Sequence, residues 1–473
     1  MSSRLEATNG EMIIILYILD SLRPDFLSCY GYPKKTSPHI DTLAREGIIF
    51  TNAFAQSTWT RSSGASILSS TYPSVHGVFT VKDILPAALP TFPERLKKGG
   101  FKTIAISAIG NISTDFGFGN GFESFVELYK DQKLMEKRAR IDIREGGRKH
   151  KWIVGSDYVP ICTSEDINQS LFSFLHENGG SNTFILIWSM DTHSPYFHRD
   201  PEIARSCAPS DAVWAPRELL NMHADKDLRR LKSLYEDMIY YNDYHIGALI
   251  EKLKELNLFQ HTLFVLTSDH GESFSEHGVN SHGAAPYDEL VRIPLIMKFP
   301  DSQFAGKVDG LVQLIDLAPT ILEYLKMSEN DMLIQGKSLL PMLKGQKKVN
   351  DYVFAEFQRS EGLPKYTSLR TLDYKYMEAR PGKFTIKRSM IQTISPLVRS
   401  IIRDRFLFCL RETGEKVNLV RKEKKKAKQF QDQIKAILRE NVEISRRVRK
   451  VKRGKMDVDQ EVSKQLKALG YFD

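Results

Sequence analysis

The sequence predicts an α/β protein with a mostly parallel, doubly wound central sheet flanked by helices, followed by a small C-terminal antiparallel α+β subdomain. Two observations support this fold class. Apolar runs of strand length alternate with segments of helical spacing through residues 1–345, which is typical of a parallel sheet covered on both faces. Beyond residue 345, short strand-like segments follow one another closely. We therefore expect an α/β domain at 1–345, an α+β subdomain at 346–420 and a basic helical tail at 421–473.

The predicted elements can be placed in order along the chain. Strands are expected at 13–20, 48–54, 102–108, 183–190, 263–266 and 292–299. Helices are expected between them at 36–47, 65–71, 91–100, 231–258 and 316–325. Those at 36–47 and 91–100 begin at a threonine and end at glycine, as capped helices do. The C-terminal subdomain should contain short antiparallel strands at 352–357, 366–372 and 374–378.

The basic charge of the chain is concentrated near its C-terminus. The formal charge is +9, but residues 421–455 carry 15 Lys/Arg against 4 Asp/Glu, so the rest of the chain is close to −2. This distribution argues against a nucleic-acid-binding body. A basic helix is expected at 420–438, with an apolar face of Phe430, Ile434, Ile437 and Leu438. This basic helix is most simply interpreted as a solvated helix packed on the body. The apolar and basic stretch 388–405 supports a sharper hypothesis, in which 388–455 contacts an anionic membrane peripherally or binds a polyanionic glycan.

Composition limits the cellular setting. The chain is 41% hydrophobic and 26% charged, as globular proteins usually are. Its four cysteines show no CxxC spacing, which disfavours zinc knuckles and disulfide scaffolds. The N-terminal residues lack the order of a signal peptide, and no apolar run is long enough to span a bilayer. We expect a cytoplasmic protein, with the peripheral membrane contact described above.

Polar residues follow three of the predicted strands. Asp20 follows the first, Asp191 and His193 follow the strand at 183–190, and Asp269 and His270 follow the strand at 263–266. Because the carboxyl ends of parallel strands meet at one edge of a sheet, these side chains should lie together. Two carboxylates and an imidazole form an open site for a divalent cation, so Asp20, Asp269 and His270 are candidate metal ligands. The alternative is that they are helix caps or solvated loop residues.

An oxygen nucleophile would come from the polar turn at 56–64, which precedes a predicted helix. Backbone N–H groups at a helix start can hold an anion, and a hydroxyl bound to a metal becomes a usable nucleophile. The residue types alone do not choose among its hydroxyls, and a Ser/Thr-rich helix start is also a plain capping pattern. The candidates are Ser57, Thr58, Thr60, Ser62 and Ser63.

Several ordered motifs closely resemble the sulfatase family of the alkaline phosphatase superfamily. They include YILDSLRPDFLSCYGYPKKTSPHIDTLAREGIIFTNAFAQ, STWTRSSGASILSSTYPSVHGV, SMDTHSPY, TSDHGESFSEHG with SHGAAPYDELVRIPLI, and the ending VDQEVSKQLKALGYFD. The resemblance covers nearly the whole chain and implies the family's fold, a divalent metal ion (Mn, Mg, Ca or Zn) and action on esters.

The resemblance also selects the nucleophile. The family pattern is Cys or Ser, x, Pro, Ser, Arg, followed by a helix that ends in Tyr-Pro. Counting back from Tyr72 and Pro73 places Thr60 at the nucleophile and Gly64 at the arginine. A competing register would start at Ser57 and place Arg61 at the arginine, but it requires a shift against Tyr72. We therefore favour Thr60.

A threonine changes the expected chemistry. Sulfatases convert the Cys or Ser to formylglycine, and threonine cannot form that aldehyde, so no formylglycine is expected. A phosphothreonine can be attacked directly by water or by an alcohol. The resemblance implies that His193 and His282 contact the transferred or leaving group. Ser21 stands where many sulfatases have a second Asp, and Gly64, Ser107, Ala108 and Asn111 occupy positions of the family's anion-binding arginine and lysine segment.

We therefore expect a metal-dependent hydrolase acting on phosphate mono- or diesters through Thr60, or transferring the phosphoryl group to an alcohol. Its catalytic residues would be Thr60, His193 and His282. The substrate would be an anionic ester, a phosphorylated or sulfated glycan or lipid, and not a nucleic acid. The first alternative is a sulfuric ester hydrolase. The second is a degenerate member that binds an anionic glycan or lipid without turnover.

Overall fold

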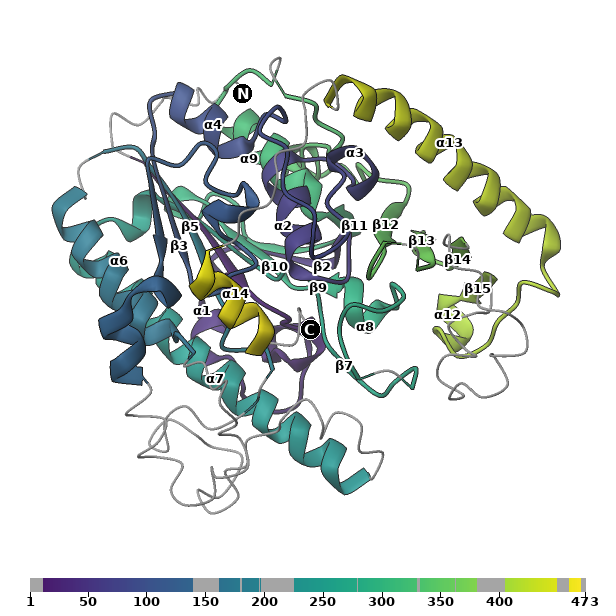
Figure 1. The fold of residues 1–473 in the computed structure, drawn as a ribbon, viewed down its shortest axis with the longest axis horizontal. Helices are drawn as coiled ribbons and strands as arrows, with labels where there is room; N and C mark the ends of the chain where they lie inside the picture. Colours follow the sequence, from purple (N-terminus) through teal and green to yellow (C-terminus); the bar gives the residue numbers. More distant parts are fainter. Residues whose placement is uncertain are drawn as a thin grey trace.

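The computed structural model describes residues 12–138, 161–178, 181–194, 196, 225–278, 280–329, 332–361, 363–380, 405–448 and 459–468. Its main feature is a mixed sheet in the order β11-β2-β10-β6-β1-β5-β3-β4, with β9 paired to β2 (Figure 1). The strands are β1 (Ile13–Leu19), β2 (Ile48–Phe54), β3 (Lys102–Ser107), β4 (Ser124–Glu127), β5 (Thr183–Ser189), β6 (Thr262–Thr267), β9 (Arg292–Ile293), β10 (Leu295–Lys298) and β11 (Gly306–Gln313). The predicted mostly parallel sheet is confirmed.

Strand β1 lies at the centre of the sheet, between β5 and β6. Its seven residues are all buried, which explains why they form a continuous apolar run rather than an alternating one. Both neighbours are parallel to it, and the register pairs Leu19 with Ser189 and Ile18 with Thr267. The three strands therefore end at the same level, and the segments that follow them emerge at one edge of the sheet.

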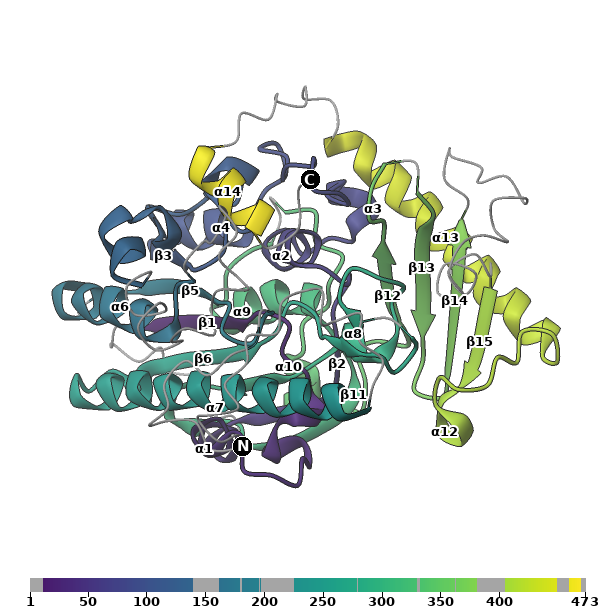
Figure 2. The same ribbon diagram turned by 60° about the horizontal axis from the view of Figure 1, so that its bottom comes forward.

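Helices cover both faces of the sheet, as the doubly wound prediction requires. One face carries α1 (Pro38–Glu46), α6 (Ser164–Asn178) and α7 (Asp225–Glu255), and α7 packs against both of the others (Figure 2). The other carries α2 (Thr60–Ser69), α4 (Phe92–Lys98) and α9 (Leu317–Tyr324). Shorter helices are α3 (Pro73–His76), α8 (Asp288–Val291), α10 (Leu340–Leu343) and α12 (Leu410–Thr413). The core fills the space between these layers.

Two expectations about single elements were wrong. The strand expected at 292–299 is divided into β9 and β10 at Pro294, and β10 runs antiparallel to both β2 and β6. Proline has no N–H to donate to a ladder, so the strand breaks there. The helix expected to start at 65 starts at Thr60, because Trp59 is extended (φ −155°, ψ 153°) and the next residue is already helical.

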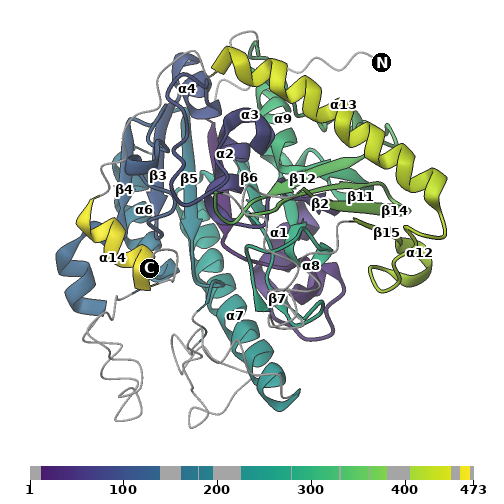
Figure 3. The ribbon, with the colours of Figure 1, turned by 45° about the vertical axis from the view of Figure 1, so that its right-hand side comes forward.

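The C-terminal part forms a four-stranded antiparallel sheet, as predicted. Its strands are β12 (Val353–Phe357), β13 (Lys365–Arg370), β14 (Tyr374–Arg380) and β15 (Arg405–Cys409). Helix α13 (Lys424–Val448) lies across this sheet and reaches α3 (Figure 3). It buries Phe430, Ile434 and Ile437 against the sheet. The boundaries expected at 345 and 420 stay a prediction.

Further described elements are a pair of short antiparallel strands, β7 (Ser273–Phe274) and β8 (Asn280–Ser281), the last helix, α14 (Gln460–Ala468), and several short 3-10 helices. Of the stretch predicted at 388–405, only Arg405 falls within the described residues. Among the helices in the described ranges, none combines the length and apolarity that a membrane crossing requires. The cytoplasmic location stays a prediction.

Candidate metal and catalytic site

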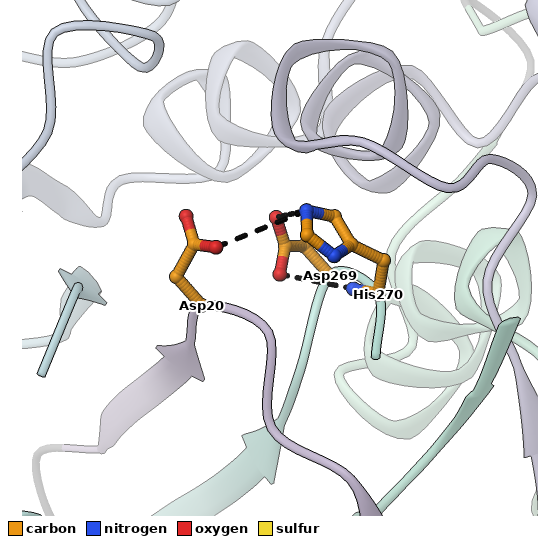
Figure 4. Close-up of side chains that lie close together, drawn as sticks. All are labelled: Asp20, Asp269 and His270. Carbon is orange, nitrogen blue, oxygen red and sulfur yellow. Dashed lines mark hydrogen bonds and ion pairs between the residues drawn. The ribbon is translucent and has the colours of Figure 1, made fainter. Parts of the chain in front are cut away.

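The three candidate metal ligands lie together at the carboxyl edge of the sheet. Asp20 follows β1, and Asp269 and His270 follow β6; ligand atoms of all three lie within 4.8 Å of one another (Figure 4). His270 Nε2 is 3.3 Å from Asp269 Oδ2 and 3.8 Å from Asp20 Oδ1. All three side chains are buried. The predicted cluster forms because the adjacent parallel strands β1 and β6 end at the same edge of the sheet.

Thr60, the first residue of α2, contacts this cluster. Its Oγ1 lies 3.4 Å from Asp20 Oδ2 and 3.3 Å from His270 Nε2. Ser57, the nucleophile of the competing register, is also buried, but its hydroxyl makes no hydrogen bond within the described structure. Arg61, the arginine of that register, donates to the carbonyl of Val81 and to Asn111 Oδ1 at 2.9 Å. The structure therefore brings Thr60 to the carboxylates.

Neighbouring donors hold the two carboxylates in place. Trp188 Nε1 donates to Asp20 Oδ2 at 3.2 Å, and Ser21 Oγ donates to Asp20 Oδ1 at 2.9 Å. Backbone N–H groups of Ser21 and His270 donate to Asp269 Oδ1 at 3.2 and 2.9 Å. Ser21 has a positive φ of 65°, which turns its N–H toward Asp269. The other carboxylate oxygen, Asp269 Oδ2, has no hydrogen-bond donor among the described residues.

The electrostatics of the cluster favour a cation. Burial and the charge of Asp20 raise the pKa of Asp269 well above its ordinary value. Burial also acts to raise the pKa of Asp20, but the charges of His193, His270 and His282 lower it overall. Two adjacent buried carboxylates repel each other, and a divalent ion would offset both charges. The donor set and the orphaned oxygen Asp269 Oδ2 therefore fit a metal.

His193 and His282 complete the site. The His282 ring centroid is 4.5 Å from that of His270 and 4.9 Å from that of His193. His282 Nδ1 lies 3.3 Å from Glu272 Oε1, and the Tyr196 hydroxyl donates to Glu272 Oε2 at 2.5 Å. Glu272 is only 1% exposed. All six predicted site residues thus converge, and Glu272 is a further one that sequence reasoning did not assign.

The position that carries an arginine in the family pattern is sterically closed. A Cβ added to Gly64 would lie 2.7 Å from Ile112 Cδ1 and 3.1 Å from Trp188. The side chain of Asn111 is engaged by Arg61 rather than directed at the cluster. Packing around α2 therefore leaves little space for a longer side chain at residue 64.

Three further polar residues, Asp191, His277 and His76, make contacts outside this cluster. Asp191 Oδ2 accepts hydrogen bonds from Ser164 and Asn242, so it joins α6 and α7 to the sheet. His277 pairs with Glu289 at 2.7 Å and belongs to a separate group with Glu415. His76 is buried against Ser66. Trp188 could have been recognised only as a strand residue, although it touches Asp20.

Known families and structures resemble this chain over most of its length. A family model described as Sulfatase matches residues 13–327, and one described as N-sulphoglucosamine sulphohydrolase, C-terminal, matches residues 276–381. An ulvan-active sulfatase of Formosa agariphila is 25% identical over 78% of this chain and 73% of its own length. An N-acetylglucosamine-6-O-sulfatase of Bacteroides thetaiotaomicron is 24% identical over 76% of this chain and 77% of its own length. The structure of a phosphonate monoester hydrolase of Agrobacterium radiobacter has a TM-score of 0.68 at 20% identity, covering 91% of this chain and 95% of that one.

Proposed function

This chain belongs to the sulfatase family and is an ester-hydrolysing enzyme, and on that premise we propose that it cleaves phosphate mono- or diesters with Thr60 as its nucleophile. The observation that carries the proposal is the contact of the Thr60 hydroxyl with Asp20 and His270. Threonine has no route to formylglycine, so the hydroxyl itself must attack. Phosphorus accepts such an attack, because the resulting phosphothreonine can be hydrolysed directly.

The proposed reaction has two steps. Thr60 Oγ1 forms a bond to phosphorus while the bond to the alcohol oxygen of the substrate breaks, and that oxygen leaves with a proton. A water molecule, or an acceptor alcohol, then attacks the phosphothreonine and frees Thr60. A divalent cation held by Asp20, Asp269 and His270 would acidify the hydroxyl and offset charge on the transferred group.

The two remaining histidines are suited to move protons. The side chains of His193 and His282 are both largely buried. The His282 ring lies between those of His270 and His193, with centroid distances of 4.5 and 4.9 Å. A histidine within reach of the leaving oxygen contributes by donating a proton as the bond breaks. Glu272 Oε1 lies 3.3 Å from Nδ1 of His282 and so fixes the orientation of that ring.

Sulfate ester hydrolysis is the second candidate, and the names of the relatives favour it over the phosphate reading. The curated relatives reported above are sulfatases, whereas a phosphonate monoester hydrolase shares only the fold at 20% identity. Thr60 argues in the opposite direction, since a sulfated threonine lacks the elimination route that formylglycine provides. The sugar-directed names of the relatives support an anionic sugar ester as substrate in either case.

One assay separates these candidates. Nitrophenyl phosphate, bis-nitrophenyl phosphate and nitrophenyl sulfate are offered with Mn²⁺, Mg²⁺, Ca²⁺ or Zn²⁺. We expect turnover of a phosphate ester, a loss of about 10³-fold or more in Thr60→Ala, and little change in the matched control Ser57→Ala. Turnover of the sulfate alone would establish the second candidate. Equal activity of Thr60→Ala and the wild type would remove Thr60 from the mechanism.

A further inference from the structure

A second binding region lies beside helix α13, away from the metal cluster. A cavity of about 470 Å³ is bounded by α13, the end of α3 and strands β13 and β14, and its lining includes Lys365, Arg380, Val442, Ser445 and Arg446. A second cavity of about 350 Å³ shares Arg380 and Val442 and continues along α13 to Lys435 and Arg439. We call the two together the α13 groove. From residue 435 to residue 446 the helix rises about 16 Å, the length of a short oligosaccharide.

The groove is lined mainly by cations. Lys365, Arg380, Lys435, Arg439 and Arg446 border it, against the single carboxylate of Glu443. Lys365 and Arg380 pair with the buried carboxylates of Glu356 and Glu378, at 2.7 and 3.1 Å. Arg446 pairs with Glu443 at 2.7 Å, and both of these side chains are exposed. An exposed pair contributes little, about 0–1 kcal/mol, so an incoming sulfate or phosphate group can replace Glu443 as the partner of Arg446.

The rest of the lining suits a sugar rather than a purely ionic ligand. The hydroxyls of Ser74 and Ser445 offer hydrogen bonds, while Leu438, Val442 and Phe79 form an apolar floor. Lys365 Nζ stands 3.8 Å from the centre of the Phe79 ring. Sugar rings combine apolar C–H faces with hydroxyls, and their sulfate or phosphate substituents would meet the surrounding cations.

The same helix is poorly suited to a lipid bilayer. A helix that lies on a membrane inserts its apolar face. The apolar face of α13 is used inside the protein, where Phe430, Ile434 and Ile437 pack against the C-terminal sheet. Figure 3 shows the helix lying over that sheet. Val442, at 46% exposure, is the one large apolar residue of α13 that is exposed in the described structure. A recessed, cationic and hydroxyl-bearing groove remains, without an insertable face.

The groove is connected to the catalytic site through one packed cluster. Tyr366, next to Lys365, packs with Phe357 and Trp59, and Trp59 immediately precedes Thr60. Arg380 likewise follows Ala379, which borders the same cluster. We propose that the α13 groove binds an anionic oligosaccharide, a sulfated or phosphorylated sugar chain, as a site separate from the metal cluster. The proposal concerns binding only and does not depend on which ester the enzyme hydrolyses.

The test uses the full chain and a fluorescent, heparin-derived octasaccharide, with neutral dextran as the uncharged comparison. The variant Arg439→Glu/Arg446→Glu should bind the octasaccharide about tenfold more weakly or worse. The control Lys424→Glu/Lys425→Glu makes the same charge change on exposed residues of α13 outside both cavities, and should bind nearly as the wild type does. Val442→Trp, which fills the groove without changing charge, should also weaken binding.

Turnover of a nitrophenyl ester reports that each variant is folded and that the catalytic site is intact. Equal loss of binding in the groove variant and the control would overturn the proposal, since charge alone would then explain it. So would the absence of octasaccharide binding by the wild type. Flotation with vesicles of equal parts phosphatidylcholine and phosphatidylglycerol, lost in the groove variant while octasaccharide binding persists, would assign the surface to membranes instead.

Discussion

Replacement of Glu272 should separate the stability of the site from its proton chemistry. Its buried carboxylate accepts from the Tyr196 hydroxyl at 2.5 Å and lies 3.3 Å from His282 Nδ1. Glu272→Ala would leave both donors buried without this acceptor, at about 1–3 kcal/mol each, so the free energy of unfolding should fall by about 2–6 kcal/mol. Glu272→Gln keeps the volume and one acceptor oxygen, and should cost about 1–2 kcal/mol.

The kinetic effect of Glu272→Gln depends on the leaving group. The carboxylate selects the His282 tautomer that carries its proton on Nδ1 and fixes the ring. If His282 protonates the leaving oxygen, kcat should fall about 10–100-fold with phenyl phosphate, which needs that proton. It should change little with dinitrophenyl phosphate, whose leaving group departs as an anion.

The control for this experiment is Glu276→Gln, which alters a carboxylate of the same loop that pairs with Arg23 at 2.8 Å. Both variants are first compared by urea unfolding, so that kinetics are read only on folded protein. An equal loss with both phosphates, or unchanged kinetics in folded Glu272→Gln, would refute the positioning role of Glu272.

Three further predictions concern metal, packing and pH. Asp269→Asn removes a carboxylate whose pKa is raised by burial and by Asp20, so without metal the melting temperature of this variant should exceed that of the wild type. Mn²⁺ at a hundredfold excess over Kd should stabilise the wild type by about 2.7 kcal/mol. The same addition should have little effect on the variant. Gly64→Ala places a Cβ 3.1 Å from Trp188. The cost of overpacking, about 1–3 kcal/mol, should exceed the gain in helix propensity of about 0.5–1 kcal/mol, so urea unfolding should show a less stable protein. Turnover assays should show a lower kcat, because Trp188 supports Asp20. Burial acts to lower the pKa of His277, but the hydrogen bond and charge of Glu289, with Glu415, raise it overall. The pairing of His277 with Glu289 therefore stabilises the folded protein fully below about pH 6.5, the ordinary histidine pKa, and this stabilisation is lost as the pH rises through the pKa of His277 in the folded state. His277→Gln should flatten the pH dependence of the melting temperature by about 1–2 °C.

The sequence was most informative where burial is complete. The β1 run is apolar without interruption because both faces of the sheet are covered, and Asp20 directly after it is conspicuous for that reason. Asp269 stands out in the same way, because it follows the fully buried strand β6. Thr60 was different: five hydroxyls in its turn were chemically equivalent, and only the family pattern selected it. The structure adds the contact with Asp20 that the residue types could not supply.

The direction of individual strands and the side-chain contacts between distant residues could not be predicted from the sequence. An apolar run such as β10 has the same composition whether it runs parallel or antiparallel, so its pairing with β6 emerged only from the fold. The helix start at Thr60 was missed because Ser and Gly disfavour helix, and tertiary packing overrides that preference. In the sequence Trp188 is an ordinary strand residue and Glu272 an ordinary loop carboxylate. Their roles depend on contacts with Asp20 and Tyr196, which lie 168 and 76 positions away.

The charge of the site bears on the kind of ester it accepts. Within the described residues, no lysine or arginine donates a hydrogen bond to Asp20, Asp269 or Thr60. Gly64 has no side chain and is closely packed, and Arg61 donates to Asn111. Positive charge near the transferred group must then come from a bound cation and from protonated histidine. Such a site offers less compensation to a dianionic phosphate monoester than to a monoanion. A phosphate diester and a sulfate monoester are both monoanions, so the charge of the site suits either, and the choice between them returns to the chemistry of Thr60.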